Sequence, residues 1–491
     1  MQVQTLLKKR LSLKQIIVLV IVLSSVRVVL EWMLLTYPIE LDGTQDYIRF
    51  YLENVYYFII AFLLISVALS LIIKKSFIDV ANFGARMYMV ILLPPLLDFF
   101  IFNRTAGYVY ATIPNFLGNL FTLSIVQGDA SYGIILELIL ALSGVSWYAF
   151  TRSKSLLRTA AAIFAITLII TILSTPDIFF GEGKGDFYYD YFLPAYYFLP
   201  LLVLSSILYY NANNKNKKKL WAMLFELRPG RAVKFMIVAA LGVLAAYSFG
   251  YSINWYNAAY AIIAIFFVRQ SAVALNDIYD YSIDKISNAK RPLVKKTLEK
   301  HELKNIALIC SAFAISLSAI INLKVLFIVL IGLLFGVLYS VPPFRLRNNL
   351  LGHFIIALSL LICLASGFLI TNDASKILSS LNLKFGAWLL ITGLSSSFSK
   401  DFKDIKGDSK EKIINLYTLL GRNKGKKIVT YLLFFSFLIP SLFIQNPAFI
   451  AGSAATAIAT AFLYYKKGDE RPVYLMSSIF GIIVFYMLYM V

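Results

Sequence analysis

Two short polar runs in an otherwise apolar chain contain residue types that could bind metal ions. The first run reads NDIYDYSID and places an amide and three carboxylates at Asn276, Asp277, Asp280 and Asp284. The second run reads KDFKDIKGD and places three carboxylates at Asp401, Asp404 and Asp408. On an α-helix the first set covers about 100° of the circumference, and the second about 60° if its helix continues that far. Carboxylates this close repel one another, so they need raised pKa values or divalent cations.

Magnesium fits such ligands because it takes one or two carboxylates, keeps water and completes its coordination with phosphate oxygens. Two facing acidic rows, each holding one Mg²⁺, would form a cradle for a diphosphate. An alternative explanation, polar residues at a helix end that bind no metal, is sufficient for one such row. They are a weak explanation for two rows about 120 residues apart that are both expected at the same membrane surface.

The chain that positions these rows is too apolar for a soluble protein. Of its 491 residues, 59% are hydrophobic and 15% are charged, whereas soluble domains contain about 25% charged residues. Lys and Arg outnumber Asp and Glu by 46 to 26. In a membrane protein this excess marks cytoplasmic loops rather than a nucleic-acid surface. We therefore expect an all-α, polytopic protein of the lipid bilayer that binds no nucleic acid.

Apolar runs of about 17–25 residues can cross a bilayer as helices. The first part of the chain contains six, near residues 15–36, 54–73, 87–103, 132–150, 159–175 and 191–210. The second part contains nine, near 233–250, 255–275, 304–322, 325–341, 350–370, 384–399, 428–444, 447–465 and 472–490. Pro114 and three other breakers interrupt a further run, 108–126, which is not counted. Because the tract NANNKNKKK (211–219) is too polar to be packed in a span, we predict a six-helix membrane domain over 1–214 and a nine-helix bundle over 215–491.

The distribution of basic residues orients these spans. With a cytoplasmic N-terminus and no crossing at 108–126, most of the 46 basic residues fall in inside segments. The long outside loops, near 37–53 and 176–190, are acidic. This arrangement places both acidic rows at the cytoplasmic side and the C-terminus outside.

Around the acidic rows, the chain resembles the UbiA superfamily of intramembrane prenyltransferases. NDIYDYSID followed by NAKRPL (288–293) is similar to the first signature of that superfamily, and KDFKDIKGD is similar to the second. YSVPPFRLR (339–347) and TLLG (418–421) also match flanking segments in order and spacing. The resemblance covers about residues 220–491, including the nine predicted helices, and leaves 1–214 outside.

The resemblance implies an enzyme that transfers the prenyl group of an isoprenyl diphosphate to a hydrophobic acceptor and releases pyrophosphate, with Mg²⁺ as cofactor. It implies metal ligands at Asn276, Asp280, Asp284, Asp401, Asp404 and Asp408, with Asp277 as a further or supporting ligand. It implies diphosphate binding by Asn276, Lys290, Arg291 and Arg345. The expected catalytic residues are Asp280, Asp284, Asp401, Asp404, Arg269 and Tyr339. For each basic residue, ordinary cytoplasmic loop charge is the alternative, and we assign Lys400, Lys403 and Lys406 to that class.

Arg269 and Tyr339 each have two interpretations. Arg269 lies seven residues before Asn276, which is about 20° away around a helix and about 10 Å deeper. An arginine within a span usually faces the bundle interior, so we expect it to border the active-site chamber, with a structural polar pair as the alternative. Tyr339 could guide a prenyl cation with its ring, or serve as an interfacial aromatic anchor.

Four other ionisable residues look structural. His301 and His353 have no neighbours at a spacing that would mark ligands or bases. Asp98 lies close to the outer end of a span and is expected to reach water there, and Glu137 has no evident partner within its span.

The resemblance does not decide the identity of the acceptor, because more than one branch of the family is similar. The run 400–408 with TLLG looks most like the branch that makes archaeal ether lipids, adding geranylgeranyl to geranylgeranylglyceryl phosphate. Branches that prenylate aromatic rings for quinones, tocopherols and chlorophylls are also similar. A cation-coupled transporter is the alternative from another class. It would place acidic residues at the bilayer midplane on broken helices, whereas these rows start at helix ends.

Overall fold

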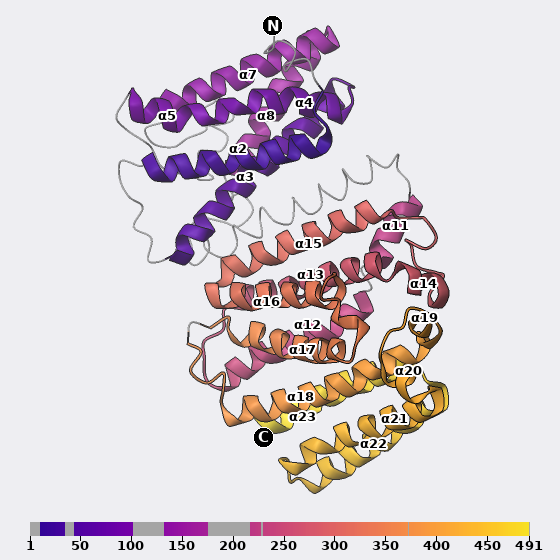
Figure 1. Cartoon of the computed structure of the whole chain (residues 1–491). Helices are drawn as coiled ribbons and strands as arrows, with labels where there is room; N and C mark the ends of the chain where they lie inside the picture. The colour runs from indigo at the N-terminus through magenta and orange to yellow at the C-terminus, as the bar shows by residue number, and fades with distance from the viewer. Residues whose placement is uncertain are drawn as a thin grey trace. The chain divides into compact units, whose positions relative to one another are not determined.

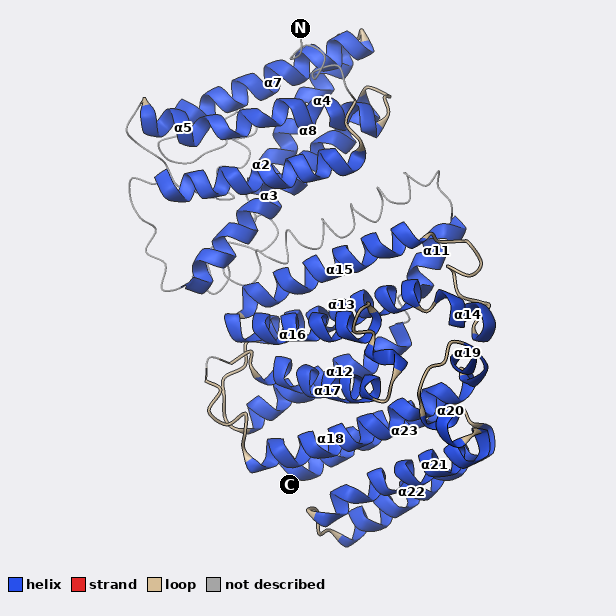
Figure 2. Cartoon of the chain, in the orientation of Figure 1, coloured by secondary structure: helices blue, strands red, loops and turns tan. Residues whose placement is uncertain are grey.

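The computed structural model describes residues 10–34, 44–101, 132–174, 217–226, 229–371 and 373–490. Every regular element in these ranges is a helix (Figure 2). Twelve of these helices are long and apolar enough to cross a membrane. The chain is therefore an all-α, multi-pass integral membrane protein. It divides into two compact units, residues 1–212 and 213–491, and Figure 1 shows the helices of each.

The N-terminal unit has five candidate spans in its described residues. Its helices are α2 (Leu13–Leu34), α3 (Thr44–Ile72), α4 (Phe77–Met87), α5 (Leu93–Phe100), α7 (Tyr132–Ser153) and α8 (Leu156–Ser174). The third span runs over Phe77–Phe100, so the predicted start at residue 87 was wrong. The span was hard to place because a 3₁₀ turn, Tyr88–Leu92, joins α4 to α5 just before Pro94. The predicted span 191–210 and the uncounted run 108–126 lie outside the described residues.

A buried ion cluster lies inside the N-terminal unit. The fully buried guanidinium of Arg27 is 2.7 Å from Glu31 Oε1 and 3.8 Å from Glu137 Oε2, and it donates to the Ile91 carbonyl at 2.6 Å. The expectation that Glu137 has no partner was therefore wrong. Because Glu137 lies on α7 and Ile91 in the 3₁₀ turn, Arg27 connects α2 to both of these elements.

Asp98 does not reach water as predicted. Its side chain is buried, and Asp98 Oδ1 accepts a hydrogen bond from the backbone N–H of Gly133 at 2.8 Å. A Cβ at Gly133 would lie 2.6 Å from Pro94 Cα, so the glycine lets α5 and α7 approach closely enough for this bond.

Replacing Arg27 with methionine is expected to destabilise the N-terminal unit by about 3–5 kcal/mol, because two carboxylates lose their buried cation. Thermal unfolding in detergent, followed by circular dichroism, measures the effect. Arg10→Met is the control, because the Arg10–Asp79 pair is exposed and an exposed pair contributes about 1 kcal/mol or less. Equal melting temperatures for both variants would show that the buried cluster does not hold the unit together.

The C-terminal unit contains nine long helices in its described residues, one at each predicted span, and seven of the nine are long and apolar enough to count as candidate membrane spans. They follow the short α11 (Lys217–Glu226) and are α12 (Pro229–Ser248), α13 (Trp255–Tyr279), α15 (Lys300–Ile321), α16 (Leu323–Ser340), α17 (Leu351–Phe368), α18 (Ser380–Ser399), α21 (Arg422–Leu438), α22 (Pro447–Lys467) and α23 (Glu470–Tyr489). Side-chain oxygens of Asn254, Asn322, Ser379 and Asn446 cap the first turns of four of them. The core is aromatic: Phe385, Trp388, Phe437 and Phe480 are buried together.

The short helices between these spans gather at one end of the C-terminal unit (Figure 1). They are α14 (Tyr281–Ser287), α19 (Ile405–Lys410) and α20 (Leu416–Leu420). Helices α14 and α19 pack closely because Gly407 has no side chain: a Cβ there would lie 2.7 Å from Ser287 Oγ and 2.9 Å from Ile283 Cγ2. This contact brings together the two segments that contain the acidic rows.

Candidate functional site

The first acidic row lies on a break between two helices, not on one continuous face. Helix α13 ends at Tyr279, Asp280 links it to α14, and Asp284 lies on α14. The prediction of a single helical sector was therefore wrong. The break turns the chain across the end of the bundle, and the Asp277, Asp280 and Asp284 side chains are all buried, while Asn276 is partly exposed.

The second row also lies across a break. Helix α18 ends at Ser399, Asp401 lies in the 3₁₀ turn Lys400–Lys403, Asp404 follows that turn, and Asp408 lies on α19. The helix thus does not continue through the motif, and the 60° sector does not form. All three carboxylates are buried, so each one must be matched by a hydrogen bond, a cation or a proton.

Two side chains connect the rows to each other. Arg347 Nε is 2.6 Å from Asp280 Oδ2, and Arg347 Nη1 is 3.4 Å from Asp408 Oδ1. The amide of Asn288 donates to Asp284 Oδ1 at 2.9 Å and to Asp404 Oδ1 at 3.1 Å. The two rows, about 120 residues apart in sequence, therefore line opposite sides of one polar cluster.

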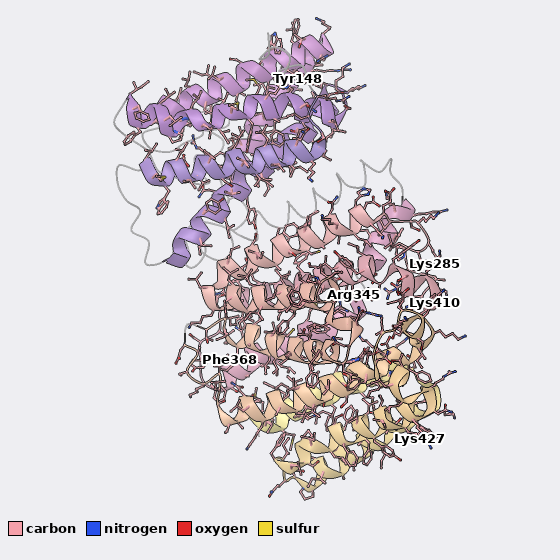
Figure 3. All side chains as sticks on the ribbon, in the orientation of Figure 1. Tyr148, Lys285, Arg345, Phe368, Lys410 and Lys427 are labelled. Carbon is pink, nitrogen blue, oxygen red and sulfur yellow. The ribbon has the colours of Figure 1, made fainter. Side chains whose placement is uncertain are left out.

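Two of the three predicted diphosphate-binding cations join this cluster. Arg291 contacts Asp277 Oδ2 at 3.3 Å and Asp284 Oδ1 at 3.6 Å, and Arg345 contacts Asp280 Oδ1 at 3.4 Å. Lys290 is exposed on the turn after α14. Figure 3 shows Lys285 and Lys410 at the outer edge of this end of the unit, with Arg345 further in.

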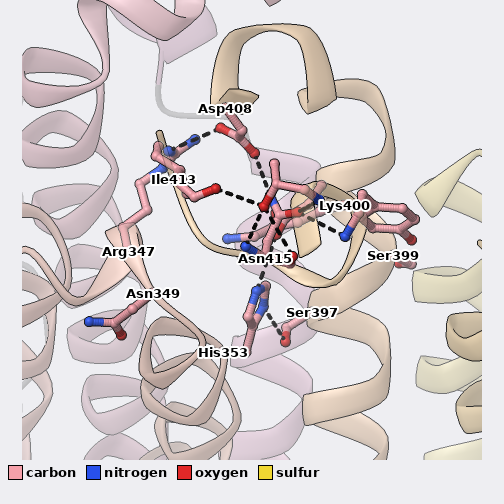
Figure 4. Close-up of polar contacts among 12 residues, drawn as sticks. Arg347, Asn349, His353, Ser397, Ser399, Lys400, Asp408, Ile413 and Asn415 are labelled. Atoms are coloured by element: carbon pink, nitrogen blue, oxygen red, sulfur yellow. Dashed lines mark hydrogen bonds and ion pairs between the residues drawn. The ribbon is translucent and has the colours of Figure 1, made fainter. Parts of the chain in front are cut away.

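Sequence reasoning missed several members of the cluster. His353 was treated as structural, but its Nε2 is 3.1 Å from Asp401 Oδ2 and its Nδ1 is 3.0 Å from Ser397 Oγ. Asn415, the N-cap of α20, donates to Asp408 Oδ2 at 2.8 Å. Figure 4 shows these contacts beside the Arg347–Asp408 pair. Arg347 lies two residues after Arg345, in the same FRLR segment. The two alternating arginines were the sequence feature that could have identified Arg347 as a member of the cluster.

The prediction for Lys400 was also wrong. It was assigned to ordinary loop charge, but its Nζ donates to the Tyr339 hydroxyl at 2.5 Å and lies 5.0 Å from the Tyr339 ring centroid. Lys403 pairs with Glu470 at 2.5 Å instead of facing solvent alone. The guanidinium of Arg269 lies over the Phe235 ring of α12, 5.5 Å from its centroid, so it faces a neighbouring helix of the bundle. Its place beside the chamber stays a prediction.

The pKa values of the carboxyls differ according to their neighbours. Burial, together with the charge of Asp280, raises the pKa of Asp284 to about 7. Burial likewise raises the pKa of Asp408 to about 7 and that of Asp404 above its usual range. Burial opposes the charge on Asp401 as well, but the adjacent His353 holds the pKa of Asp401 below its usual value. For Asp284, Asp404 and Asp408, burial therefore opposes ionisation more than the neighbouring cations favour it.

Clustered carboxylate oxygens are the hard donor set that a divalent cation requires. In the described ranges, no three acidic, histidine or cysteine side chains converge closely enough to hold a metal ion as they stand. Arg347 and Asn288 instead connect the carboxylates that would be the ligands. The residues fit Mg²⁺ in chemical type, and binding requires these two side chains to give up contacts with the aspartates.

These raised pKa values predict a pH-dependent stability. A carboxyl whose pKa is raised on folding stabilises the fold below its unfolded pKa near 4, and this contribution is lost as pH rises through the folded pKa of about 7. We expect the melting temperature of chelator-treated protein to fall as pH rises from about 4 to about 7 and to level off by pH 8, and we expect Mg²⁺ to restore it at pH 8. Differential scanning fluorimetry measures both effects. The Asp284→Asn/Asp408→Asn variant should remove most of the pH dependence, and an unchanged slope would contradict the assignment.

Comparison with known proteins relates this geometry to a family. The model of the UbiA prenyltransferase family matches residues 235–485. A digeranylgeranylglyceryl phosphate synthase of Methanococcus maripaludis strain C6 is 31% identical over 188 residues, which cover 38% of this chain and 64% of that protein. The enzyme of the same name from Methanosphaera stadtmanae is 26% identical over 42% of this chain and 71% of that protein. The chain thus spans less than two thirds of the first of these relatives.

An aromatic-ring enzyme and a solved structure are also similar. A probable homogentisate phytyltransferase of rice is 27% identical over 43% of this chain and 60% of that protein. The structure of a UbiA homologue from Archaeoglobus fulgidus bound to GPP and Mg²⁺ has a TM-score of 0.43 and 17% identity. The match covers 54% of this chain and 99% of that structure.

Proposed function

Because the chain belongs to the UbiA prenyltransferase family, we propose that its C-terminal domain, residues 215–491, transfers a prenyl group from an isoprenyl diphosphate to a hydrophobic acceptor and releases pyrophosphate. One observation supports the proposal above the others: Arg347 and Asn288 bridge two buried acidic rows from distant parts of the chain. Carboxylates repel an anionic substrate unless cations lie between the carboxylates and the substrate. The oxygens of a diphosphate can complete the coordination of such cations.

In this proposal the aspartates hold Mg²⁺, with Asn276, Asp280 and Asp284 in one row and Asp401, Asp404 and Asp408 in the other. Bound Mg²⁺ would supply Lewis-acid stabilisation of the leaving pyrophosphate. The allylic C–O bond breaks with its electron pair staying on the pyrophosphate oxygen. The acceptor then forms a bond to the same carbon and loses a proton, which balances the reaction.

The arginines of the cluster have a complementary role. Arg291, Arg345 and Arg347 now contact aspartates, and each presents further N–H donors in a planar fork that suits phosphate oxygens. When the aspartates bind metal, these arginines become available to the diphosphate. His353 holds the Asp401 carboxylate in its ionised form, so that this ligand needs no deprotonation before it binds metal.

For the acceptor we propose geranylgeranylglyceryl phosphate, with an aromatic ring compound as the second candidate. The relatives named as digeranylgeranylglyceryl phosphate synthases support the first, and the rice phytyltransferase supports the second. A cation-coupled transporter is the alternative from another class. The acidic rows lie in the last turn of α13 and beyond the ends of α13 and α18, and this position disfavours a transporter, because transport sites lie near the midplane of the bilayer.

We also propose that the N-terminus and the mouth of the site face the cytoplasm, and that the C-terminus lies outside. The concentration of basic residues in the corresponding loops supports this orientation. Residues 1–214 then form a separate membrane domain that precedes the enzyme domain.

A pyrophosphate-release assay tests the proposed reaction. Purified full-length protein receives geranylgeranyl diphosphate, an acceptor and either Mg²⁺ or a chelator. We expect pyrophosphate and the prenylated product in equal amounts, and only when metal, donor and acceptor are all present. Release of pyrophosphate without any acceptor would indicate a hydrolase, and no release with any donor would reject the assignment.

The packing of α14 on α19 predicts a steric variant. Gly407→Val places methyl groups against Ser287 Oγ, Ile283 Cγ2 and the Ile283 carbonyl, all within 3.2 Å of the new Cβ. The two short helices must separate, and a misplacement of about 1 Å costs about 100-fold in rate. Gly452→Val in α22 is the matched control, since a Cβ there meets nothing within 4 Å. Equal turnover in both variants, measured by product formation, would show that helix spacing does not matter.

A further inference from the structure

Basic residues gather at the start of α21 without an acidic residue beside them. The first six residues of this helix read RNKGKK, its first turn contains no acidic residue, and no side chain caps it. The N-terminal end of a helix has a partial positive charge, so cations are unfavourable there and acidic residues are the usual choice. The basic residues are Arg422, Lys424, Lys426 and Lys427. They would be stabilised by a negative charge that the helix itself does not supply.

These four cations have no carboxylate partner among the residues that the structure describes. By contrast, Lys403 contacts Glu470 at 2.5 Å and Arg347 contacts Asp280 at 2.6 Å, both at the same end of the unit. Lys426 is partly buried, and the other three cations of α21 are exposed. The charge at the start of α21 is therefore unbalanced within the described part of the chain and accessible to a ligand from outside.

Two of the cations share one aromatic ring. Arg422 Cζ is 5.0 Å and Lys426 Nζ is 4.8 Å from the Phe402 ring centroid. The face of a ring attracts a cation, but the ring is neutral, so it holds the two groups in place without balancing their charge. Arg422 and Lys426 are four residues apart on one helix, and like charges at this spacing repel each other. An anion bound between them would remove that repulsion.

The neighbouring helix adds two more cations. Lys466 and Lys467 lie in the last turn of α22, and both are exposed. Lys426 Nζ is also 5.8 Å from the Tyr465 ring centroid, which places the start of α21 beside the end of α22. Figure 1 shows these two helices side by side, and Figure 3 shows Lys427 at the edge of the unit. We call the six basic residues the α21–α22 basic surface: Arg422, Lys424, Lys426, Lys427, Lys466 and Lys467.

The position of this surface favours a membrane lipid over a soluble anion. Arg422 begins one candidate membrane span, and Lys467 ends the next. The cations therefore lie at the depth expected for lipid headgroups on that side of the bilayer. Leu419 and Leu420, just before the start of α21, are exposed apolar side chains. Basic residues beside exposed apolar residues at a membrane surface are typical of segments that bind anionic lipid.

We propose that the α21–α22 basic surface binds the phosphate headgroup of an anionic phospholipid from the surrounding bilayer. The phosphate accepts charge-assisted hydrogen bonds from Arg422 and Lys426 and reduces the repulsion between them. Lys466 and Lys467 attract the same headgroup from the neighbouring helix, and the two leucines before α21 contact the acyl chains. The lipid is a ligand of this surface and not a substrate, so the inference does not depend on the proposed prenyl transfer.

Native mass spectrometry of the full-length protein in detergent tests this binding, because it resolves bound lipid molecules and gives the dissociation constant of the first. The two lipids are phosphatidylglycerol and phosphatidylcholine with the same acyl chains. One basic residue near an anionic membrane surface contributes about fivefold to binding. Wild type should therefore bind the first phosphatidylglycerol about tenfold or more tightly than phosphatidylcholine. Glycerophosphoglycerol, the same headgroup without acyl chains, should not displace the lipid.

Charge-neutral variants locate the binding surface. Arg422→Gln/Lys426→Gln should weaken phosphatidylglycerol binding about 5- to 30-fold, the range for losing one to two such contributions, and leave phosphatidylcholine binding unchanged. Its melting temperature without added lipid should equal or exceed that of wild type, because two like charges are removed from the N-terminal end of a helix. Lys466→Gln/Lys467→Gln should weaken binding of the same lipid from the other helix.

Lys285→Gln/Lys410→Gln is the matched control, because it removes two exposed lysines at the same end of the unit (Figure 3). Its affinity for phosphatidylglycerol should stay close to that of wild type. An equal loss in this control and in Arg422→Gln/Lys426→Gln would show a response to overall positive charge and would overturn the inference. Equal affinity of wild type for both lipids, or displacement by the soluble headgroup, would also overturn it. Should Arg422→Gln/Lys426→Gln not fold, the variant in α22 decides the test, because its two side chains are exposed at a helix end.

Discussion

Replacing Arg347 with methionine is expected to lower kcat by about 100-fold or more, the usual cost of removing one charged or polar donor from a developing negative charge. Arg347 is the only described residue that contacts both Asp280 and Asp408, and it has further N–H donors for a diphosphate. Single-turnover formation of the prenylated product, at saturating donor and Mg²⁺, measures the chemical step directly.

Arg347→Lys and Lys410→Met are the comparisons. The lysine variant keeps a positive charge but cannot contact two carboxylates in a planar fork, so its rate should lie between those of wild type and Arg347→Met. Lys410 is an exposed lysine on α19, at the same end of the unit, and its removal should leave kcat within twofold of wild type (Figure 3). A normal kcat for Arg347→Met would remove this arginine from the reaction.

Changing Asp404 to asparagine is expected to lower turnover about 1,000-fold and to raise the Mg²⁺ concentration for half-maximal rate at least tenfold. Asp404 belongs to the second row and shares the Asn288 amide with Asp284 of the first. Loss of a ligand removes several kcal/mol of metal-based stabilisation, and about 1.4 kcal/mol corresponds to tenfold in rate. Initial rates over a range of Mg²⁺ concentrations separate the two effects.

This variant should not unfold the protein. Burial raises the pKa of Asp404, so its ionised form opposes folding at neutral pH, and a neutral amide of the same size removes that cost. The melting temperature of metal-free Asp404→Asn should therefore equal or exceed that of wild type. Asp373→Asn, on an exposed loop at the other end of α18, is the control for turnover. Unchanged turnover and Mg²⁺ dependence in Asp404→Asn would exclude Asp404 as a ligand.

The helices of the C-terminal unit were predictable because a membrane span leaves a long apolar signal. All nine predicted runs overlap an observed helix, from α12 to α23. The positions at which these helices end were not predictable from periodicity. In both acidic motifs the aspartates are spaced as on one continuous helix. The chain nevertheless leaves the helix within each motif, at Asp280 and at Asp404. Tertiary contacts such as Gly407 on Ile283 decide these breaks, and a single segment does not reveal them.

The partners of charged residues within spans could not be predicted from the sequence. Asp98 and Glu137 look isolated along the chain, yet Asp98 accepts from Gly133 and Glu137 faces Arg27 of another helix. Partners of this kind are separated by 35 residues or more, so sequence spacing cannot identify them. Lys400 shows the same limit, because its partner Tyr339 lies on a different helix.

The acidic motifs were recognisable, but their partners were not. Asn288 and Arg347 lie within motifs that the sequence singled out, and only the fold shows that each of them bridges the two rows. The residues next to His353 in the sequence do not indicate its contact with Asp401, because the two residues are 48 positions apart. The sequence therefore indicated which kinds of residue form the site, whereas the contacts between these residues depended on three-dimensional packing.

The most direct test of the two-row site is a binding cycle with a donor analogue that cannot ionise, geranylgeranyl S-thiolodiphosphate. Isothermal calorimetry with and without Mg²⁺ gives its affinity for wild type, Asp284→Asn, Asp404→Asn and the double variant. We predict Mg²⁺-dependent binding in wild type and at least a tenfold loss in each single variant. In the double variant we predict a loss well below the product of the two, because the residues act on one ligand. Tight binding that needs no metal, or that survives in the double variant, would contradict the account.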